Sequence, residues 1–293
     1  MKKVVSVALA LCMAAAVTGC AGEPAAAEST APESSSAAES TAEEAPAEEA
    51  AEEPAEEAAE EPAAEVAVMS YDEYAAIEVN EGDRVPVTIQ GYVQAKQDLY
   101  TDSATGLSNT SLYLQDEDGA YFAYRVQCTP EDFEKLTEGV CVQVSGDKTM
   151  WSGEVEIAEG CTFTFVEGAD TFVAEPLDVT EMLGTDELVS HQNQKVTFTG
   201  LTVAPSTMEG DETEYAFLYN WDGSGTEGDD IYFNVEYNGE VYQFLVESDL
   251  CGSDSEVYNA VKNLQVGQTI DCEGFLYWYE GVNPHITSVT VAG

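Results

Sequence analysis

Few residues of this 293-residue chain have the types and spacing that catalysis requires. There are two histidines, His191 in the polar run SHQNQ and His285 directly after a proline. The sequence has no nucleophile elbow, no zinc-binding HExxH helix and no phosphate-binding loop. We therefore expect a protein without enzymatic activity and without a cofactor, with a secreted hydrolase as the less favoured alternative. We expect His285 to contact a ligand or the core rather than to act as a base.

Aromatic side chains are the better candidates for a site. The run from Phe275 to Tyr279 alternates along a predicted strand, so either Trp278 or its tyrosine neighbours must face outward. Rings exposed at a barrel edge suit stacking on sugars, peptides or aromatic ligands. Packing of these rings against the other half of the chain is the alternative. We expect the ligand-binding residues to be Trp221, Tyr277, Trp278, Tyr279 and Trp151.

Neither a metal site nor a disulfide is strongly indicated. Asn220, Asp222 and Ser224 match the start of a calcium loop, but Ile231 occupies the position of the bidentate glutamate, so we expect an acidic turn without metal. Five cysteines follow residue 65, an odd number that precludes complete intramolecular pairing. We expect buried thiols; if any pair bonds, Cys251 and Cys272 are the favoured partners.

The N-terminus predicts export and lipidation. Two lysines precede an apolar stretch that is too short to span a bilayer comfortably, and Val-Thr-Gly-Cys20 ends it. This ending resembles the lipobox of bacterial lipoproteins, which implies that Cys20 is acylated and becomes the mature N-terminus. Two or more acyl chains anchor a protein stably. We expect an extracytoplasmic protein on the outer face of the cell membrane.

Residues 21–65 predict a disordered linker. They are rich in Ala, Glu and Pro, with no Leu, Ile, Val or Phe, so they cannot bury a core. The whole chain has 57 acidic and 9 basic residues, a formal net charge of −48. Because nucleic-acid affinity usually depends on Lys and Arg at phosphates, we expect no nucleic acid as a partner.

The remainder of the chain is an internal repeat. VTIQG at 87–91 corresponds to VTFTG at 196–200, and each copy then has a hairpin, at Asp118-Gly119 and at Asn238-Gly239. Both dipeptides tolerate the positive φ of type I′ turns. A capped helix and a last hairpin follow in each copy, with Trp151 and Trp278 in matching places. The second copy carries an insertion at 215–230.

The order strand, strand, strand, helix, strand, strand is that of the OB-fold, a five-stranded Greek-key barrel. We expect a mainly β protein with two tandem OB-fold-like barrels at 66–168 and 169–293, after a signal peptide at 1–20 and the linker at 21–65. An immunoglobulin-like sandwich is the competing fold, but it would not place a helix between the third and fourth strands.

The lipobox, the Ala/Glu/Pro linker and the strings YLQDEDGAYFAYRV, WSGEVEIA and LYWYEGVNPHITSV together resemble a group of lipoproteins from Gram-positive anaerobes. The resemblance implies tandem OB-like domains in the cell envelope and no assigned activity. We therefore expect a lipid-anchored, extracytoplasmic binding or adaptor protein whose ligand is an unknown small molecule, glycan or protein. The alternative from another class is an OB protein that binds single-stranded nucleic acid.

Overall fold

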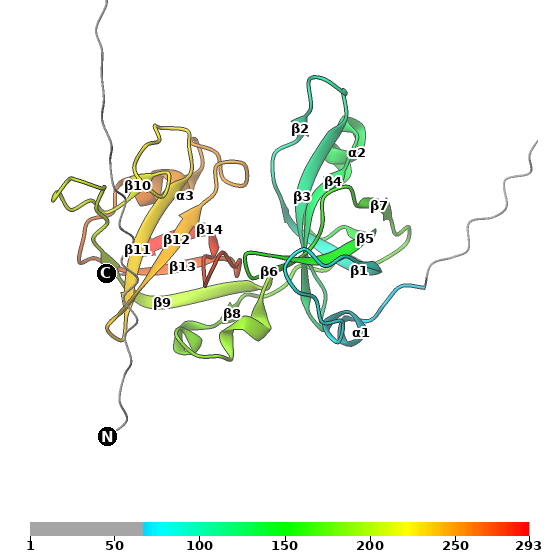
Figure 1. The fold of residues 1–293 in the computed structure, drawn as a ribbon, viewed down its shortest axis with the longest axis horizontal. Coiled ribbons are helices and arrows are strands. Elements are labelled where there is room, and N and C mark those ends of the chain that lie inside the picture. The colour runs from blue at the N-terminus through cyan, green and yellow to red at the C-terminus, as the bar shows by residue number, and fades with distance from the viewer. Residues whose placement is uncertain (1–66, 293) are drawn as a thin grey trace, which may run out of the picture. The chain divides into compact units, whose positions relative to one another are not determined.

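The structure is a computed structural model that describes residues 67–292, and it contains two β-barrels (Figure 1). Cys20 and the linker at 21–65 lie outside the described residues. The elements of the first barrel and its surroundings are α1 (Tyr71–Ala75), β1 (Val85–Lys96), β2 (Tyr100–Thr101), β3 (Ser108–Gln115), β4 (Ala120–Gln127), α2 (Pro130–Lys135), β5 (Cys141–Trp151), β6 (Glu154–Ile157) and β7 (Thr162–Phe165).

The first barrel is closed by hydrogen bonds between its first and fourth strands. Its strand order is β1-β3-β4-β6-β5, and β5 pairs back to β1. All neighbours are antiparallel except β4 and β6, where Phe122 pairs with Glu156 in a parallel arrangement. Strands β2 and β7 extend the sheet beyond the five barrel strands.

The second barrel repeats this topology. Its elements are β8 (Leu177–Asp178), η1 (Thr180–Met182), η2 (Leu188–His191), β9 (Lys195–Ala204), β10 (Leu218–Tyr219), β11 (Ile231–Tyr237), β12 (Glu240–Val246), α3 (Glu256–Lys262), β13 (Thr269–Phe275) and β14 (His285–Val291). The order β9-β11-β12-β14-β13 closes through β13 and β9, with β12 parallel to β14. The prediction of two OB-fold-like barrels is therefore confirmed, and the sandwich alternative is excluded.

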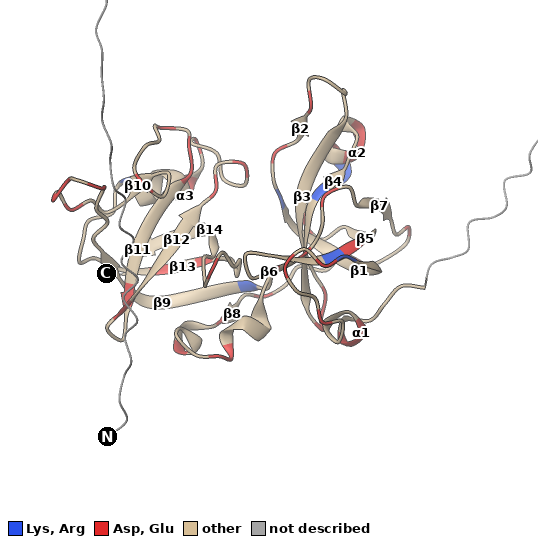
Figure 2. Cartoon of the chain, viewed as in Figure 1, with Lys and Arg blue, Asp and Glu red and all other residues tan. Residues whose placement is uncertain are grey.

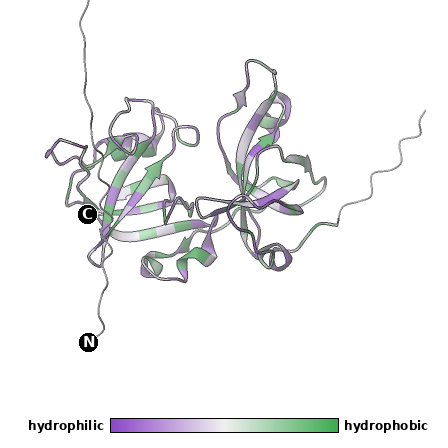
Figure 3. Ribbon diagram, viewed as in Figure 1, coloured by the Kyte–Doolittle hydropathy of each residue, from purple (hydrophilic) through white to green (hydrophobic). Residues whose placement is uncertain are grey.

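Each barrel has its own apolar core, because alternate strand residues point inward. The first core contains Ile89, Leu112 and Val144, and the second contains Phe198, Phe233 and Phe244. This alternation is visible as green and purple bands along the strands in Figure 3. A third, smaller cluster joins the two barrels and is built from Tyr113 and Phe122 of the first and Phe275 of the second.

Local sequence signals explain the helix starts. Ser70 and Glu73 form a reciprocal capping box on α1, and the Ser255 hydroxyl accepts the backbone N–H of Tyr258 at the start of α3. Thr129 caps α2 in the same way, one residue before Pro130. None of the helices described between residues 67 and 292 is long and apolar enough to cross a membrane.

The two hairpin turns differ, although they were predicted to be alike. Asn238 and Gly239 have φ values of 55° and 85°, as a type I′ turn requires. The first hairpin instead turns over Asp116–Gly119, where the Asp116 carboxylate accepts the N–H groups of Asp118 and Gly119. Gly119 is needed there for space, since a Cβ atom would overlap the Tyr71 ring. The type I′ prediction at Asp118-Gly119 is therefore wrong.

Candidate functional site

Three loops carry the predicted aromatic residues, and they are the loops that OB-folds use most often for ligands. The first is the tight turn between β5 and β6, which follows Trp151. The second, at 276–284, joins β13 to β14 in the equivalent position of the second barrel and is called the aromatic loop below. The third is the long connection between β9 and β11, which contains Trp221.

The first two loops meet each other. The rings of Trp151 and Tyr279 are 5.3 Å apart between centroids, and the Glu280 N–H donates to the Ser152 carbonyl oxygen over 2.7 Å. Positive φ values at Ser152, Gly153 and Glu280 make these sharp turns possible. Both barrels belong to one compact unit, so this meeting is part of the fold.

The meeting point borders two neighbouring cavities. A cavity of about 740 Å³ is lined by residues that include Arg84, Tyr124, Glu156 and Glu159. A second cavity of about 490 Å³ is lined by Trp151, Trp221, Asp230, Tyr232, Gln243, Leu245, Glu247, Tyr277, Tyr279, Val282, Asn283 and His285. Trp151, Glu247 and Tyr277 line both. We call the second cavity the aromatic cleft.

Four of the five predicted binding residues therefore line one cleft. Trp221, Trp151 and Tyr279 present 67%, 51% and 48% of their surface to solvent, so their rings can be reached by a ligand. Tyr277 is half-buried and stacks on the His285 ring with centroids 4.2 Å apart. Trp278 lies in the lining of neither cavity: it is half-buried and packs against the core of the second barrel.

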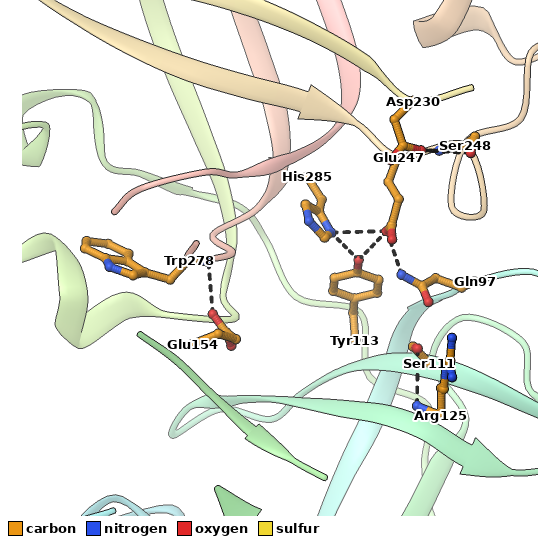
Figure 4. Close-up of polar contacts among 10 residues, drawn as sticks. All are labelled: Gln97, Ser111, Tyr113, Arg125, Glu154, Asp230, Glu247, Ser248, Trp278 and His285. Carbon is orange, nitrogen blue, oxygen red and sulfur yellow. Dashed lines mark hydrogen bonds and ion pairs between the residues drawn. The ribbon is translucent and has the colours of Figure 1, made fainter. Parts of the chain in front are cut away.

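Beneath the cleft lies a polar network that connects the barrels (Figure 4). The Tyr113 hydroxyl is 2.5 Å from His285 Nδ1 and also donates to Glu247 Oε2 over 3.2 Å. Gln97 Nε2 donates to the same carboxylate oxygen over 2.6 Å. Burial alone would raise the pKa of Glu247, but the neighbouring His285 and these hydrogen bonds outweigh it and lower that pKa. Glu247 thus favours the charged form.

The network makes His285 a residue of the interface core, one of the two roles expected for it. Its side chain is almost fully buried, and its ring lies at the edge of the Tyr113 ring. Glu247, Gln97 and Tyr113 were not predicted as site residues. Nothing in the local sequence marks them, because their contacts join positions that are more than 130 residues apart.

Two glutamates of β6 are buried beside the first cavity. Burial raises the pKa of Glu156 to about 7, with Arg84 acting in the opposite direction and Glu81 adding to the increase. Burial also raises the pKa of Glu154 well above its usual range, and its fully buried carboxyl accepts the Trp278 N–H over 2.9 Å. Glu154 therefore favours the neutral form near neutral pH, whereas Glu156 is about half protonated there.

The turn after Asn220 is used locally. Asp222 accepts the backbone N–H of Ser224 over 2.9 Å. In the part of the chain that the structure describes, no group of three His, Cys, Asp or Glu side chains could hold a metal ion. Cys251 and Cys272 are free thiols, as are the other three cysteines described.

The chain matches no family model and no curated protein. Among solved structures it resembles the Ifi202 HINa domain in complex with 20-bp dsDNA, at 15% identity over 72% of this chain and 98% of that chain, with a TM-score of 0.32. It also resembles a Replication Protein A heterotrimer bound to ssDNA, at 13% identity over 72% and 49%, with a TM-score of 0.29. The single-stranded DNA binding protein from Thermus aquaticus matches at 15% identity over 73% and 95%, with a TM-score of 0.23.

These similar structures correct two of our expectations. We expected a binding or adaptor protein whose ligand is a small molecule, glycan or protein, and we expected no nucleic acid as a partner; the expected lipid anchor is a separate matter that these structures do not test. The solved structures that the chain resembles are described as DNA complexes or DNA-binding proteins, and these descriptions run contrary to both expectations. The expectation of no nucleic acid came from net charge, which is a sum over the whole chain and does not describe one cleft with exposed rings. At these TM-scores the likeness itself identifies no ligand for this chain.

Proposed function

We propose that this chain binds single-stranded nucleic acid without catalysing a reaction, and that bases stack on the rings of the aromatic cleft. One observation carries the proposal: Trp151, Tyr279 and Trp221 are about half or more exposed and line one cleft at the loops that OB-folds use for ligands. Base stacking on aromatic side chains contributes about 1 to 3 kcal/mol per base and tolerates any sequence.

Polar groups of the cleft complement base edges rather than phosphates. The side chains of Gln243 and Asn283 offer amides, and those of Asp230 and Glu247 offer carboxylate oxygens, which accept hydrogen bonds from exocyclic amino groups. No Lys or Arg lines this cleft, and Arg84 is the one basic residue in the lining of the adjoining cavity. Acidic residues outnumber basic ones over both barrels in Figure 2.

This charge pattern predicts an unusual salt dependence. A protein that neutralises phosphates loses affinity as salt rises, because counterions were released on binding. Here phosphates approach Asp230, Glu247 and Glu159, so added salt screens repulsion instead. Affinity for single-stranded DNA should therefore stay constant or increase with salt between about 20 mM and 200 mM.

The experiment is a titration of the chain with short single-stranded oligonucleotides, followed by quenching of tryptophan fluorescence and by gel shift. Trp151→Ala and Trp221→Ala should each weaken binding by about 5- to 150-fold, the equivalent of 1 to 3 kcal/mol. Tyr100→Ala is the matched control, because Tyr100 is 54% exposed but lines neither cavity. Equal binding by all four proteins would refute the assignment of the cleft.

Anchoring and location are a separate proposal, supported by the sequence alone. Cys20 follows Val-Thr-Gly at the end of an apolar stretch, and its acylation would hold the chain on the outer face of the cell membrane. Cys20→Ser should move the protein from the membrane fraction to the medium or block its processing. Unchanged membrane association of that variant would contradict the anchor.

A further inference from the structure

Glu154 lies where the two barrels are joined most closely. It is the first residue of β6, its side chain has no exposed surface, and its Oε2 accepts the N–H of Trp278 in the aromatic loop of the other barrel. Asn193 also connects β6 to the aromatic loop. Its Nδ2 donates to the Val155 carbonyl oxygen over 3.0 Å, and its backbone N–H donates to the Leu276 carbonyl oxygen over 2.8 Å.

Two acceptor atoms in this arrangement have no donor. Glu154 Oε1 and Asn193 Oδ1 are both buried without a hydrogen-bond partner, although the two side chains are neighbours. An unpaired buried carboxylate is strongly disfavoured. Protonation of Glu154 Oε1 removes the negative charge and gives this oxygen an O–H group. That O–H group can donate a hydrogen bond to Asn193 Oδ1. One proton therefore resolves both defects.

Among the described residues, no basic side chain forms an ion pair that would neutralise a charged Glu154. Lys148, on the adjacent strand β5, donates instead to the carbonyl oxygens of Tyr74 and Ile77. Burial is the main cause of the raised pKa of Glu154, and Glu156 on the same strand adds to it, whereas the Asn193 side chain and the hydrogen bond from the Trp278 N–H act in the opposite direction without outweighing burial. The hydroxyls of Tyr74 from α1 and Tyr277 from the aromatic loop also face Glu154, and their raised pKa values leave them uncharged near neutral pH.

We propose that Glu154 is a protonated positioning residue that latches the aromatic loop to the first barrel, and that loss of its proton releases the latch. An ionised Glu154 would be a buried charge beside an unpaired acceptor, which is energetically costly. Hydration of this charge requires water to enter between Asn193 and Trp278. The aromatic loop also carries Tyr279, and Trp151 pairs with Glu154 across the β5–β6 hairpin. The latch therefore controls two walls of the cleft.

The test needs no ligand, so its outcome is independent of the proposed function. Hydrogen exchange of the Trp278 amide is measured by NMR from pH 6 to pH 9 and expressed as a protection factor. We expect protection in the native sequence to fall about tenfold or more over this range. In Glu154→Gln the protection factor of the Trp278 amide should not change with pH, because a carboxamide donates to Asn193 Oδ1 and accepts from the Trp278 N–H at every pH.

Two further proteins complete the experiment. Glu117→Gln, in an exposed turn of the first barrel, should behave like the native sequence. Glu156→Gln removes the other buried carboxyl of β6, so that the infrared carbonyl band of protonated Glu154 can be measured in this variant at pH 7.5. This measurement does not require Glu154→Gln to fold. Constant Trp278 protection in the native sequence, equal pH dependence in Glu154→Gln, or absence of that band would each overturn the proposal.

Discussion

Replacing Glu156 with Gln should make the chain more stable, and increasingly so as the pH rises. Glu156 is 6% exposed, and burial raises its pKa from 4.5 to about 7, against the effect of Arg84. The folded state therefore holds a proton that the unfolded state has lost. The stabilisation from this proton is complete below pH 4.5 and is lost as the pH rises to about 7.

The magnitude follows from linkage. Each pH unit within this window is worth about 1.4 kcal/mol for one proton. The sequence pI of about 4.1 makes pH 4 unsuitable for measurement, so the series begins at pH 5. Between pH 5 and pH 8 the native sequence should lose about 2.5 kcal/mol of unfolding free energy more than Glu156→Gln does.

The assay is urea unfolding at pH 5, 6, 7 and 8, followed by tryptophan fluorescence and circular dichroism. Other titrating groups contribute to both proteins, so the difference between the two curves isolates Glu156. Glu117→Gln serves as the exposed control and should follow the native sequence. Parallel curves for the native sequence and Glu156→Gln would refute the argument that this carboxyl is held neutral by burial.

Three further substitutions and one control test the structure by urea unfolding. Gly274→Ala should cost about 3 kcal/mol or more, because a Cβ atom would overlap the backbone of His285, whereas Gly252→Ala meets only ordinary contacts and should cost little. Tyr113→Phe should cost about 1 to 2 kcal/mol by removing a donor from Glu247, and an unchanged stability would contradict the interface network. Ser255→Ala should cost about 1 kcal/mol through loss of the α3 cap, and no loss would mean that water replaces the cap.

The fold could be predicted because its signals are local. Alternation into a glycine, the Asn238-Gly239 turn and the capping box at Ser70 each specify a short segment, and the repeat places those segments twice in the same order. The turn at Asp116–Gly119 was mistaken for type I′ because side-chain capping by Asp116 and contact with Tyr71 are set by neighbours outside the dipeptide.

The site could be predicted only in part. Its aromatic residues stood out by type, but alternation alone could not tell that Trp278 packs toward the second core while Tyr279 is exposed in the cleft. Glu154 and Glu247 were hidden among many acidic residues. The role of Glu154 depends on its contact with Trp278 of the other barrel, and the role of Glu247 on its contacts with Tyr113 and Gln97 of the other barrel. No local pattern encodes these contacts.

In the proposed binding mode, bases rather than phosphates occupy the aromatic cleft. The most direct measurement compares single-stranded DNA with a peptide nucleic acid of the same sequence, which carries bases on an uncharged backbone. We predict that the peptide nucleic acid binds more tightly, and that the gap narrows as salt screens the carboxylates of Asp230 and Glu247. Tighter binding of DNA that weakens steeply with salt, or no binding of either polymer, would contradict the account.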